Sequence, residues 1–133
     1  MTLDYIAGFL DGEGSITLCR ERKDAKFRMP MVTFSNNARC ILEEIQRFLN
    51  LSGSLIQKTE SRPNCKPSFT LNYRDNAALA VCGLLQDKVR HPSKRARIDL
   101  LLSDYKTVTP RNGKYSAEML KRKLDFEERF ASL

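Results

Sequence analysis

Residues 5–15 read Tyr5-Ile6-Ala7-Gly8-Phe9-Leu10-Asp11-Gly12-Glu13-Gly14-Ser15. Apolar residues recur through this stretch at helical spacing, which predicts a helix over residues 3–12 that Gly12 and Gly14 bring to an end. Ala7, Gly8 and Gly12 lack bulk on this helix, so another helix can approach it closely there.

Two acids stand at the end of this predicted helix. Asp11 and Glu13 lie at the C-terminal end, where the helix dipole disfavours negative charge. A bound divalent cation would compensate for that placement, because Mg²⁺ prefers hard oxygen ligands such as carboxylates and backbone carbonyls. The alternative on spacing alone is a pair of solvated acids in a glycine-rich helix end.

The remaining periodicity predicts an α+β fold, in the order α-β-β-α-β-β-α-α-α. Pro30 is expected to mark an edge strand or a bulge. Since no linker interrupts the chain, residues 1–133 are expected to form a single domain. Expected helix caps are Thr2, Ser93 and Ser116. Strands are predicted over 15–22, 26–36, 54–59 and 68–73, and further helices over 37–50, 75–89, 94–106 and from 116 onward.

Residues 6–14 resemble the nine-residue signature of the LAGLIDADG homing endonucleases. Gly8, Asp11 and Gly14 match the signature outright, and Glu13 stands where its last acid belongs. The predicted element order agrees with that family over nearly the whole chain. The resemblance implies a LAGLIDADG-like αββαββα fold with additional C-terminal helices, in which helices back an antiparallel β-sheet saddle. The implied activity is metal-dependent, site-specific hydrolysis of phosphodiester bonds in double-stranded DNA.

The resemblance also assigns catalytic roles to particular positions. Glu13 is expected to be the ligand of Mg²⁺, or of another divalent cation such as Mn²⁺, with the Gly12 carbonyl assisting it. Asn36 is expected to contact the attacking water, and Arg39 to reach the water network or the scissile phosphate. Lys94 is expected to aim at the scissile phosphate. No small-molecule cofactor is expected.

Only one copy of the signature is present, so one chain supplies half a site. The simplest closure is a homodimer with two-fold symmetry, which favours a palindromic or nearly palindromic target. The resemblance implies that the signature helices of the two protomers pack side by side. Asp11 is expected to stiffen the helix end rather than to touch metal. The expected interface residues are Ile6, Ala7, Gly8, Leu10 and Asp11.

The second face of the predicted sheet is the expected DNA surface. A twisted two-stranded ribbon fits the major groove, where polar side chains read base edges. The expected contacts from the strands are Ser15, Thr17, Cys19, Glu21, Thr33, Lys58, Glu60, Ser68, Thr70 and Asn72. The expected contacts from the loops and their flanks, chiefly to phosphates, are Arg22, Lys23, Lys26, Arg28, Arg62 and Lys66.

Charge distribution also favours a polyanionic partner. The chain carries 23 Lys and Arg against 16 Asp and Glu, and residues 88–123 alone hold 11 basic and 3 acidic side chains. The helices of this segment are expected to add sequence-independent backbone affinity. A basic solvated face without any partner is the plainer alternative.

Other classes of protein are disfavoured by composition. The four cysteines are widely spaced and only His91 is present, which argues against a zinc set or a Ser-His-Asp triad. The cysteines are expected to be reduced and mostly buried, and His91 to be a loop residue. No apolar run approaches the length of a membrane span, and no secretory signal is visible at the N-terminus. These features predict an intracellular protein of a reducing compartment, such as the bacterial cytoplasm or an organelle.

Two other functions stay open at this point. The same fold can serve as a non-cleaving DNA- or RNA-binding protein, such as an intron maturase or a regulator. An unrelated α+β interaction domain with a chance glycine-acid motif is the third possibility. Glu13, Asn36 and Lys94 occurring together favours the nuclease.

Overall fold

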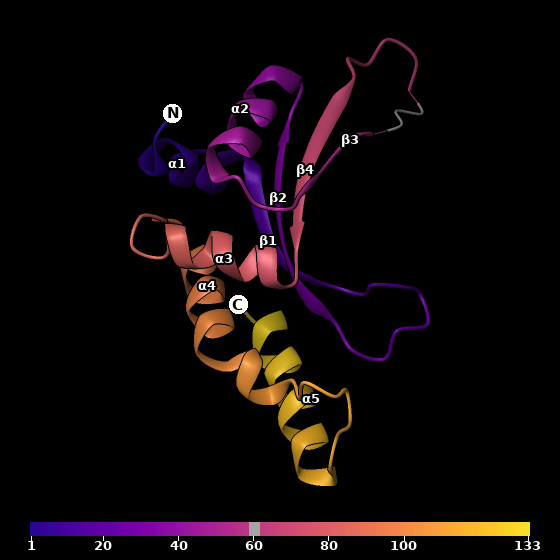
Figure 1. The fold of residues 1–133 in the computed structure, drawn as a ribbon. Coiled ribbons are helices and arrows are strands. Elements are labelled where there is room, and N and C mark those ends of the chain that lie inside the picture. Colours follow the sequence, from indigo (N-terminus) through magenta and orange to yellow (C-terminus); the bar gives the residue numbers. More distant parts are fainter. Residues whose placement is uncertain (59–61) are drawn as a thin grey trace.

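The computed structural model describes residues 1–58 and 62–133 (Figure 1). Its elements follow the predicted α+β order, with one short 3₁₀ turn, η1, added before the last helix. The helices are α1 (Leu3–Glu13), α2 (Arg39–Leu49), α3 (Asn76–Leu85), α4 (Pro92–Asp104) and α5 (Ala117–Ala131), and η1 covers Lys106–Val108. The strands are β1 (Gly14–Cys19), β2 (Met29–Asn36), β3 (Ser54–Lys58) and β4 (Ser68–Arg74).

The four strands form one antiparallel sheet in the order β1-β2-β4-β3. Strand β2 is therefore an inner strand, and its pairing with β1 runs without a bulge through Leu18 opposite Pro30. The expectation that Pro30 marks an edge or a bulge is wrong. The sheet tolerates it because Pro30 is the second residue of β2 and precedes the first pair with β4, Met31 opposite Arg74.

Helices cover one face of this sheet and leave the other face open (Figure 1). In Figure 1, α1 and α2 lie over the upper part of the covered face, α3 lies lower, and α4 and α5 lie below it. The core between helices and sheet is apolar and closely packed. Its fully buried members include Ile6, Leu10, Ile16, Val32, Phe34, Leu42, Ile45, Leu71, Tyr73, Val81 and Leu85.

Helix α1 begins and ends on recognisable local signals. The hydroxyl of Thr2, the expected cap, accepts a 3.0 Å hydrogen bond from the Tyr5 N–H. The helix continues through Gly12 to Glu13, one residue further than expected, and Gly14 follows in extended backbone. A Cβ at Gly14 would collide with the Leu10 side chain and crowd its backbone, so a larger residue there would force Leu10 to shift.

Helix α4 begins earlier than expected, and a different residue caps it. Its first residue is Pro92, whose fixed φ suits the first turn of a helix. The imidazole Nδ1 of His91 accepts a 3.4 Å hydrogen bond from the Lys94 N–H. His91 is therefore the cap, and the expected cap Ser93 lies inside the helix. The cap expected for α5 is confirmed, since the Ser116 hydroxyl accepts from the Met119 N–H at 3.1 Å.

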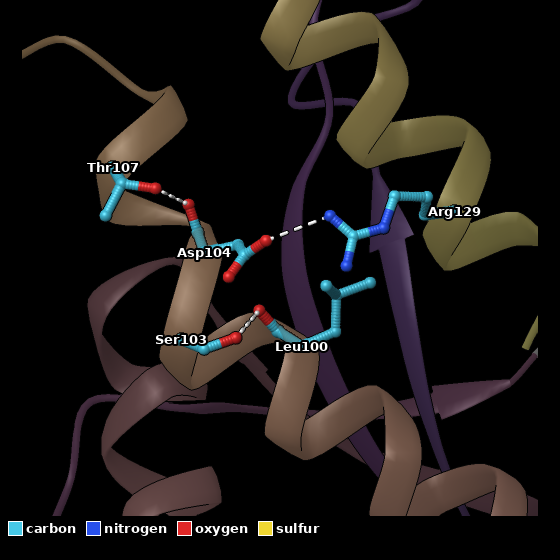
Figure 2. A network of polar contacts seen from close by, with 5 residues as sticks. All are labelled: Leu100, Ser103, Asp104, Thr107 and Arg129. Atoms are coloured by element: carbon cyan, nitrogen blue, oxygen red, sulfur yellow. Dashed lines mark hydrogen bonds and ion pairs between the residues drawn. The ribbon is translucent and has the colours of Figure 1, made fainter.

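Polar contacts join α5 to the end of α4. Figure 2 shows the Arg129 guanidinium reaching the Asp104 carboxylate, at 3.1 Å, while the Thr107 hydroxyl donates to the Asp104 carbonyl at 2.7 Å. Lys123 is only 1% exposed, and its ammonium donates to the Thr109 hydroxyl at 2.7 Å. Burial lowers the pKa of Lys123. These contacts hold the segment between α4 and α5 against the last helix.

Candidate functional site

Glu13 and Asn36 meet where α1 ends and β2 ends. The Asn36 side-chain amide donates a hydrogen bond to the Glu13 carboxylate, and its oxygen accepts from the Ala38 N–H at 2.8 Å. Both ends of the amide are therefore held, and its donor is aimed at the acid. The two residues line a shallow hollow of about 340 Å³ together with Ser35, Asn37 and Ser68. Ser35 and Asn37 were not among the expected catalytic residues, although they flank Asn36 in the sequence.

Lys94 reaches the same helix end from α4. Its ammonium donates hydrogen bonds to the carbonyl oxygens of Leu10 and Asp11, at 2.8 and 2.7 Å. Desolvation lowers the pKa of Lys94, and the Asp11 charge partly opposes that shift. The structure thus brings Lys94 to the end of the helix that carries Glu13, bound to backbone carbonyls.

Asp11 is used within its own chain. Its carboxylate accepts hydrogen bonds from the N–H of Arg90 at 3.0 Å and of His91 at 3.1 Å, both in the connection before α4. This contact fixes the end of α1, as the stiffening role expected of Asp11 requires. It also turns the carboxylate toward α4.

Arg39, the remaining expected catalytic residue, begins α2 and forms its ion pair within that helix. Its guanidinium forms a 2.8 Å ion pair with Glu43, one helical turn further along α2, and lies 5.6 Å from the centre of the Phe69 ring. The structure therefore pairs Arg39 with Glu43 and not with the carboxylate of Glu13. An i, i+4 pair of opposite charges on an exposed helix face is favourable by itself.

The donors available to a metal at this site are oxygens. Glu13 offers an exposed carboxylate, and Gly12 offers a carbonyl from the last turn of α1. This donor set fits Mg²⁺ or Mn²⁺ in chemistry. Over residues 1–58 and 62–133, no three Asp, Glu, His or Cys side chains gather in a metal-binding arrangement. Glu13 is therefore not part of a ready-made cluster of such side chains in the described part of the chain.

The exposed face of α1 differs from the expected interface. Ile6, Ala7 and Leu10 are buried in the core of the protomer, so they do not face outward as the expected interface requires. Their burial follows from helical spacing, since they share the face that covers the sheet. The outward face presents Gly8, which was among the expected interface residues, together with Gly12 and the half-exposed Tyr5. The i, i+3, i+7 spacing of these three residues in the sequence is the signal that identifies this face.

The strand register places most of the expected DNA contacts on the open face. Ser15, Thr33 and Asn72 form one row across β1, β2 and β4, and the Thr33 hydroxyl donates to the Asn72 amide oxygen at 2.8 Å. By the same alternation this face also carries Thr17, Cys19, Lys58, Ser68 and Thr70.

Three of these expectations need correction, and one residue lies outside the described part. The Thr17 hydroxyl is buried and has no hydrogen-bond partner among the described residues, so it is not available to a base edge. Thr70 is only 4% exposed, because Ser35 and Ile56 flank it on the neighbouring strands. Glu21 lies in the loop after β1, which ends at Cys19, earlier than expected. Glu60 lies outside the described residues. The basic loop residues Arg22, Lys23, Lys26, Arg28, Arg62 and Lys66 are exposed.

The basic segment 88–123 is less available to a partner than its charge implies. Lys94 is bound to α1, and Lys123 is buried. Arg97 donates a 2.8 Å hydrogen bond to the Ile16 carbonyl, and its guanidinium lies 5.1 Å from the Phe130 ring. It therefore covers part of the open edge of β1. Part of the basic excess is thus used inside the protomer.

The cysteines and the helices bear on the remaining expectations. All four cysteines are unpaired, but only Cys82 is buried, whereas Cys40 and Cys65 are exposed. The expectation that most of them fill the core is therefore wrong. In the part of the chain that the structure describes, no helix has the length and apolar character needed to cross a membrane.

Comparison of structures found proteins with this fold, whereas comparison of sequences found no matching family or protein. No protein-family model matches the chain, and no curated protein matches it. The homing endonuclease I-CvuI, solved with its target in the presence of calcium, aligns with a TM-score of 0.74 at 19% identity, over 98% of this chain and 80% of that one. The homing endonuclease I-TnaI aligns with a TM-score of 0.68 at 17% identity, over 99% and 95%.

A third structure agrees with these two. The archaeal intron-encoded homing endonuclease I-Vdi141I, solved with DNA, aligns with a TM-score of 0.63 at 18% identity, over 98% of this chain and 82% of that one. The α+β order, the four-stranded antiparallel sheet and the helices on one face are therefore shared with these proteins, and the chain has the fold of the LAGLIDADG homing endonucleases.

Proposed function

We propose that this chain is one subunit of a homodimeric, metal-dependent endonuclease that cuts double-stranded DNA at a specific site. The observation that carries the proposal is the arrangement at α1. An outward face of Tyr5, Gly8 and Gly12 runs along the helix, and the exposed Glu13 stands at its end, held by the Asn36 amide. The same helix thus offers a surface for close packing and an acid beside it.

Two-fold packing along this face would complete the site. A Cβ at Gly8 or Gly12 would meet nothing within 4 Å in the protomer, so the space beside the helix is open to a neighbour. An isologous contact there brings together the two copies of Glu13. The pair of carboxylates, with the Gly12 carbonyls, would then hold Mg²⁺ or a similar divalent cation. Bound metal would lower the pKa of the attacking water and stabilise the leaving oxygen.

The residues of this chain would orient the reacting groups around that metal. Asn36 has one amide hydrogen committed to Glu13 and a second available to a water in the hollow beside Ser68. The Lys94 ammonium brings positive charge to the end of α1, where a scissile phosphate would add negative charge. Arg39 would reach such a phosphate only by leaving Glu43.

The open face of the sheet would hold the DNA on either side of this centre. Its polar rows offer donors and acceptors to base edges, and the exposed basic loops beside it offer contacts to phosphates. Two copies related by a two-fold axis would read a palindromic or nearly palindromic target. The solved neighbours I-CvuI and I-Vdi141I are described as bound to their target and to DNA, which supports DNA as the partner here. Unpaired thiols suit the reducing, intracellular setting that such a role implies.

The test is cleavage of a randomised double-stranded DNA library, followed by assays on the recovered target. Wild-type protein is expected to cut with Mg²⁺ and to stop cutting when the metal is chelated. Glu13→Gln is expected to abolish cleavage and leave binding of the target largely intact, because it removes one charge and keeps the side-chain shape. Glu44→Gln, an exposed acid on α2, is the matched control and is expected to cut normally. Binding by the wild type without cleavage in Mg²⁺ would instead identify a non-cleaving nucleic-acid-binding protein.

A further inference from the structure

The loop between β1 and β2 lies at the far end of β1 from Glu13. It covers residues 20–28 and contains five basic side chains, Arg20, Arg22, Lys23, Lys26 and Arg28, and two acids. Strand β1 has six residues, so the loop begins about 20 Å from the start of the strand, at about 3.3 Å per residue. Along B-DNA that length corresponds to about six base pairs, at about 3.4 Å each.

This loop is attached to the C-terminal part of the chain. The ring of Phe27 packs against the ring of Tyr115, with centroids 4.4 Å apart and planes tilted by 40°. Next to it, the Arg28 N–H donates to the Glu127 carboxylate of α5 at 3.4 Å. The Lys26 ammonium lies 5.4 Å from the centre of the Phe27 ring. Phe27 therefore lies between two of the basic residues of the loop, Lys26 and Arg28.

The other side of this contact is itself held in place. Tyr115 directly precedes Ser116, the residue that caps α5. The segment that leads to it starts at Thr109, whose hydroxyl accepts a hydrogen bond from the buried Lys123. Tyr115 is thus held in place just before α5, and the β1–β2 loop is the part that gains order from the contact.

We propose that Tyr115 is a positioning residue that fixes the β1–β2 loop against α5 and thereby sets where its basic side chains contact the outer part of each DNA half-site. The inference rests on the proposed function. A nine-residue loop with this charge would otherwise sample many conformations, and ordering it on DNA would cost conformational entropy. Packing of Phe27 on Tyr115 removes part of that cost before DNA is bound.

The experiment compares Tyr115→Ala with Tyr115→Phe, which keeps the ring. Phe48→Ala, a truncation of a half-exposed aromatic on α2, is the matched control. Hydrogen exchange of the protein without DNA is measured over residues 20–28. Binding is measured on the target recovered from the library and on copies that carry one base-pair change at each position of a half-site.

Tyr115→Ala is expected to speed exchange in the loop and to weaken binding about tenfold, while Tyr115→Phe and Phe48→Ala leave both unchanged. Tyr115→Ala should lose discrimination against base-pair changes that lie about six or more base pairs from the centre of the target. Discrimination against changes near the centre should be kept. Phe27→Ala, which removes the contact from the loop side, should give the same pattern even if Tyr115→Ala folds poorly. Unchanged exchange, or an equal loss at all positions, would overturn the inference and leave the nuclease proposal standing. If the wild type binds no DNA, both the Tyr115 inference and the nuclease proposal are wrong.

Discussion

The Lys94 ammonium donates a 2.7 Å hydrogen bond to the carbonyl oxygen of Asp11. A second contact joins the same two segments, because the Asp11 carboxylate accepts hydrogen bonds from the backbone N–H groups of Arg90 and His91. The C-terminal end of α1 carries partial negative charge and the N-terminal end of α4 partial positive charge. Each end therefore receives a side chain of the opposite sign from the other helix. Glu13 follows two residues after Asp11 and takes its position from this junction.

Removal of the Lys94 ammonium should loosen that junction. Lys94→Met keeps much of the side-chain length but leaves the Leu10 and Asp11 carbonyls without their charged donor. We expect the free energy of unfolding to fall by about 1–2 kcal/mol, near the lower end of the range of about 1.5–3 kcal/mol for hydrogen bonds to charged groups, because Lys94 is partly exposed. Urea denaturation at pH 7 measures the change. Lys106→Met, which removes an exposed lysine, is the control and should change the free energy of unfolding by less than about 0.5 kcal/mol. Equal losses of unfolding free energy in the two variants would contradict the role of Lys94 at this junction.

Gly8 allows protomer stability and self-association to be separated. A methyl group at this position meets nothing within 4 Å, so Gly8→Ala should stabilise the helix of the protomer by up to about 1 kcal/mol. If two copies of α1 pack along this face, the same methyl group should weaken the dimer, and Gly8→Leu should weaken it further. Sedimentation over a range of concentrations measures association, and thermal unfolding measures stability.

Gly83→Ala on α3 is the control for this pair of measurements. Gly83 is exposed, lies within a helix and also has open space beside it. Its replacement should give a similar gain in helix stability without a change in association. Undiminished dimers of Gly8→Leu would exclude the α1 face as the interface.

Gly14 and Gly12 should respond differently to the same substitution. A Cβ at Gly14 would collide with the Leu10 side chain and crowd its backbone, whereas a Cβ at Gly12 has open space. Gly14→Ala should therefore cost about 1–3 kcal/mol of unfolding free energy, as overpacked sites do. Gly12→Ala should be neutral or stabilising in the monomer. Urea denaturation of the two variants at low protein concentration is the measurement, and equal stabilities would show that the crowding at Gly14 relaxes without cost.

The elements were predictable from sequence because their signals are local. Apolar spacing predicted the helices and strands in the right order, and Thr2 and Ser116 act as the caps expected of them. The outward face of α1 was predicted less well. Ile6 and Leu10 carry the apolar character expected of an interface, but the sheet of the same protomer takes that face. An apolar stripe on a helix does not show whether the sheet of the same chain or a second chain will cover it.

Part of the geometry of the candidate site was predictable from where the elements end. Glu13 and Asn36 follow from the ends of α1 and β2, which the sheet register then brings together. Contacts that depend on packing between distant segments were not predictable. The pairing of Arg39 with Glu43 competes with any reach toward Glu13, and His91 caps a helix only because Pro92 begins it. Such outcomes depend on relative positions that sequence periodicity does not contain.

The Tyr73 phenol predicts how stability changes in alkaline solution. Its ring is fully buried, and its hydroxyl has no hydrogen-bond partner among the described residues. Burial raises the pKa of Tyr73 from 10.0 to about 12. Below pH 10 the phenol is neutral in both states and contributes no pH dependence. Between pH 10 and 12 the unfolded chain loses the proton while the folded chain keeps it, so stability falls as pH rises.

Tyr73→Phe removes this contribution and keeps the ring. Near pH 7 the variant should be as stable as the wild type or about 1 kcal/mol more stable, because a buried hydroxyl without a partner is no longer desolvated. As pH rises above 10, its advantage should widen toward about 2–3 kcal/mol at pH 12, the free energy of that pKa difference. Burial also raises the pKa of Tyr105 and of Cys82 to about 12, so the variant should lose stability in alkali more gently rather than not at all. Urea denaturation at intervals from pH 7 to 11.5 measures the widening, with Tyr5→Phe, a half-exposed tyrosine, as the control that should follow the wild type. Parallel curves for Tyr73→Phe and the wild type would mean that the Tyr73 phenol reaches water in the folded protein.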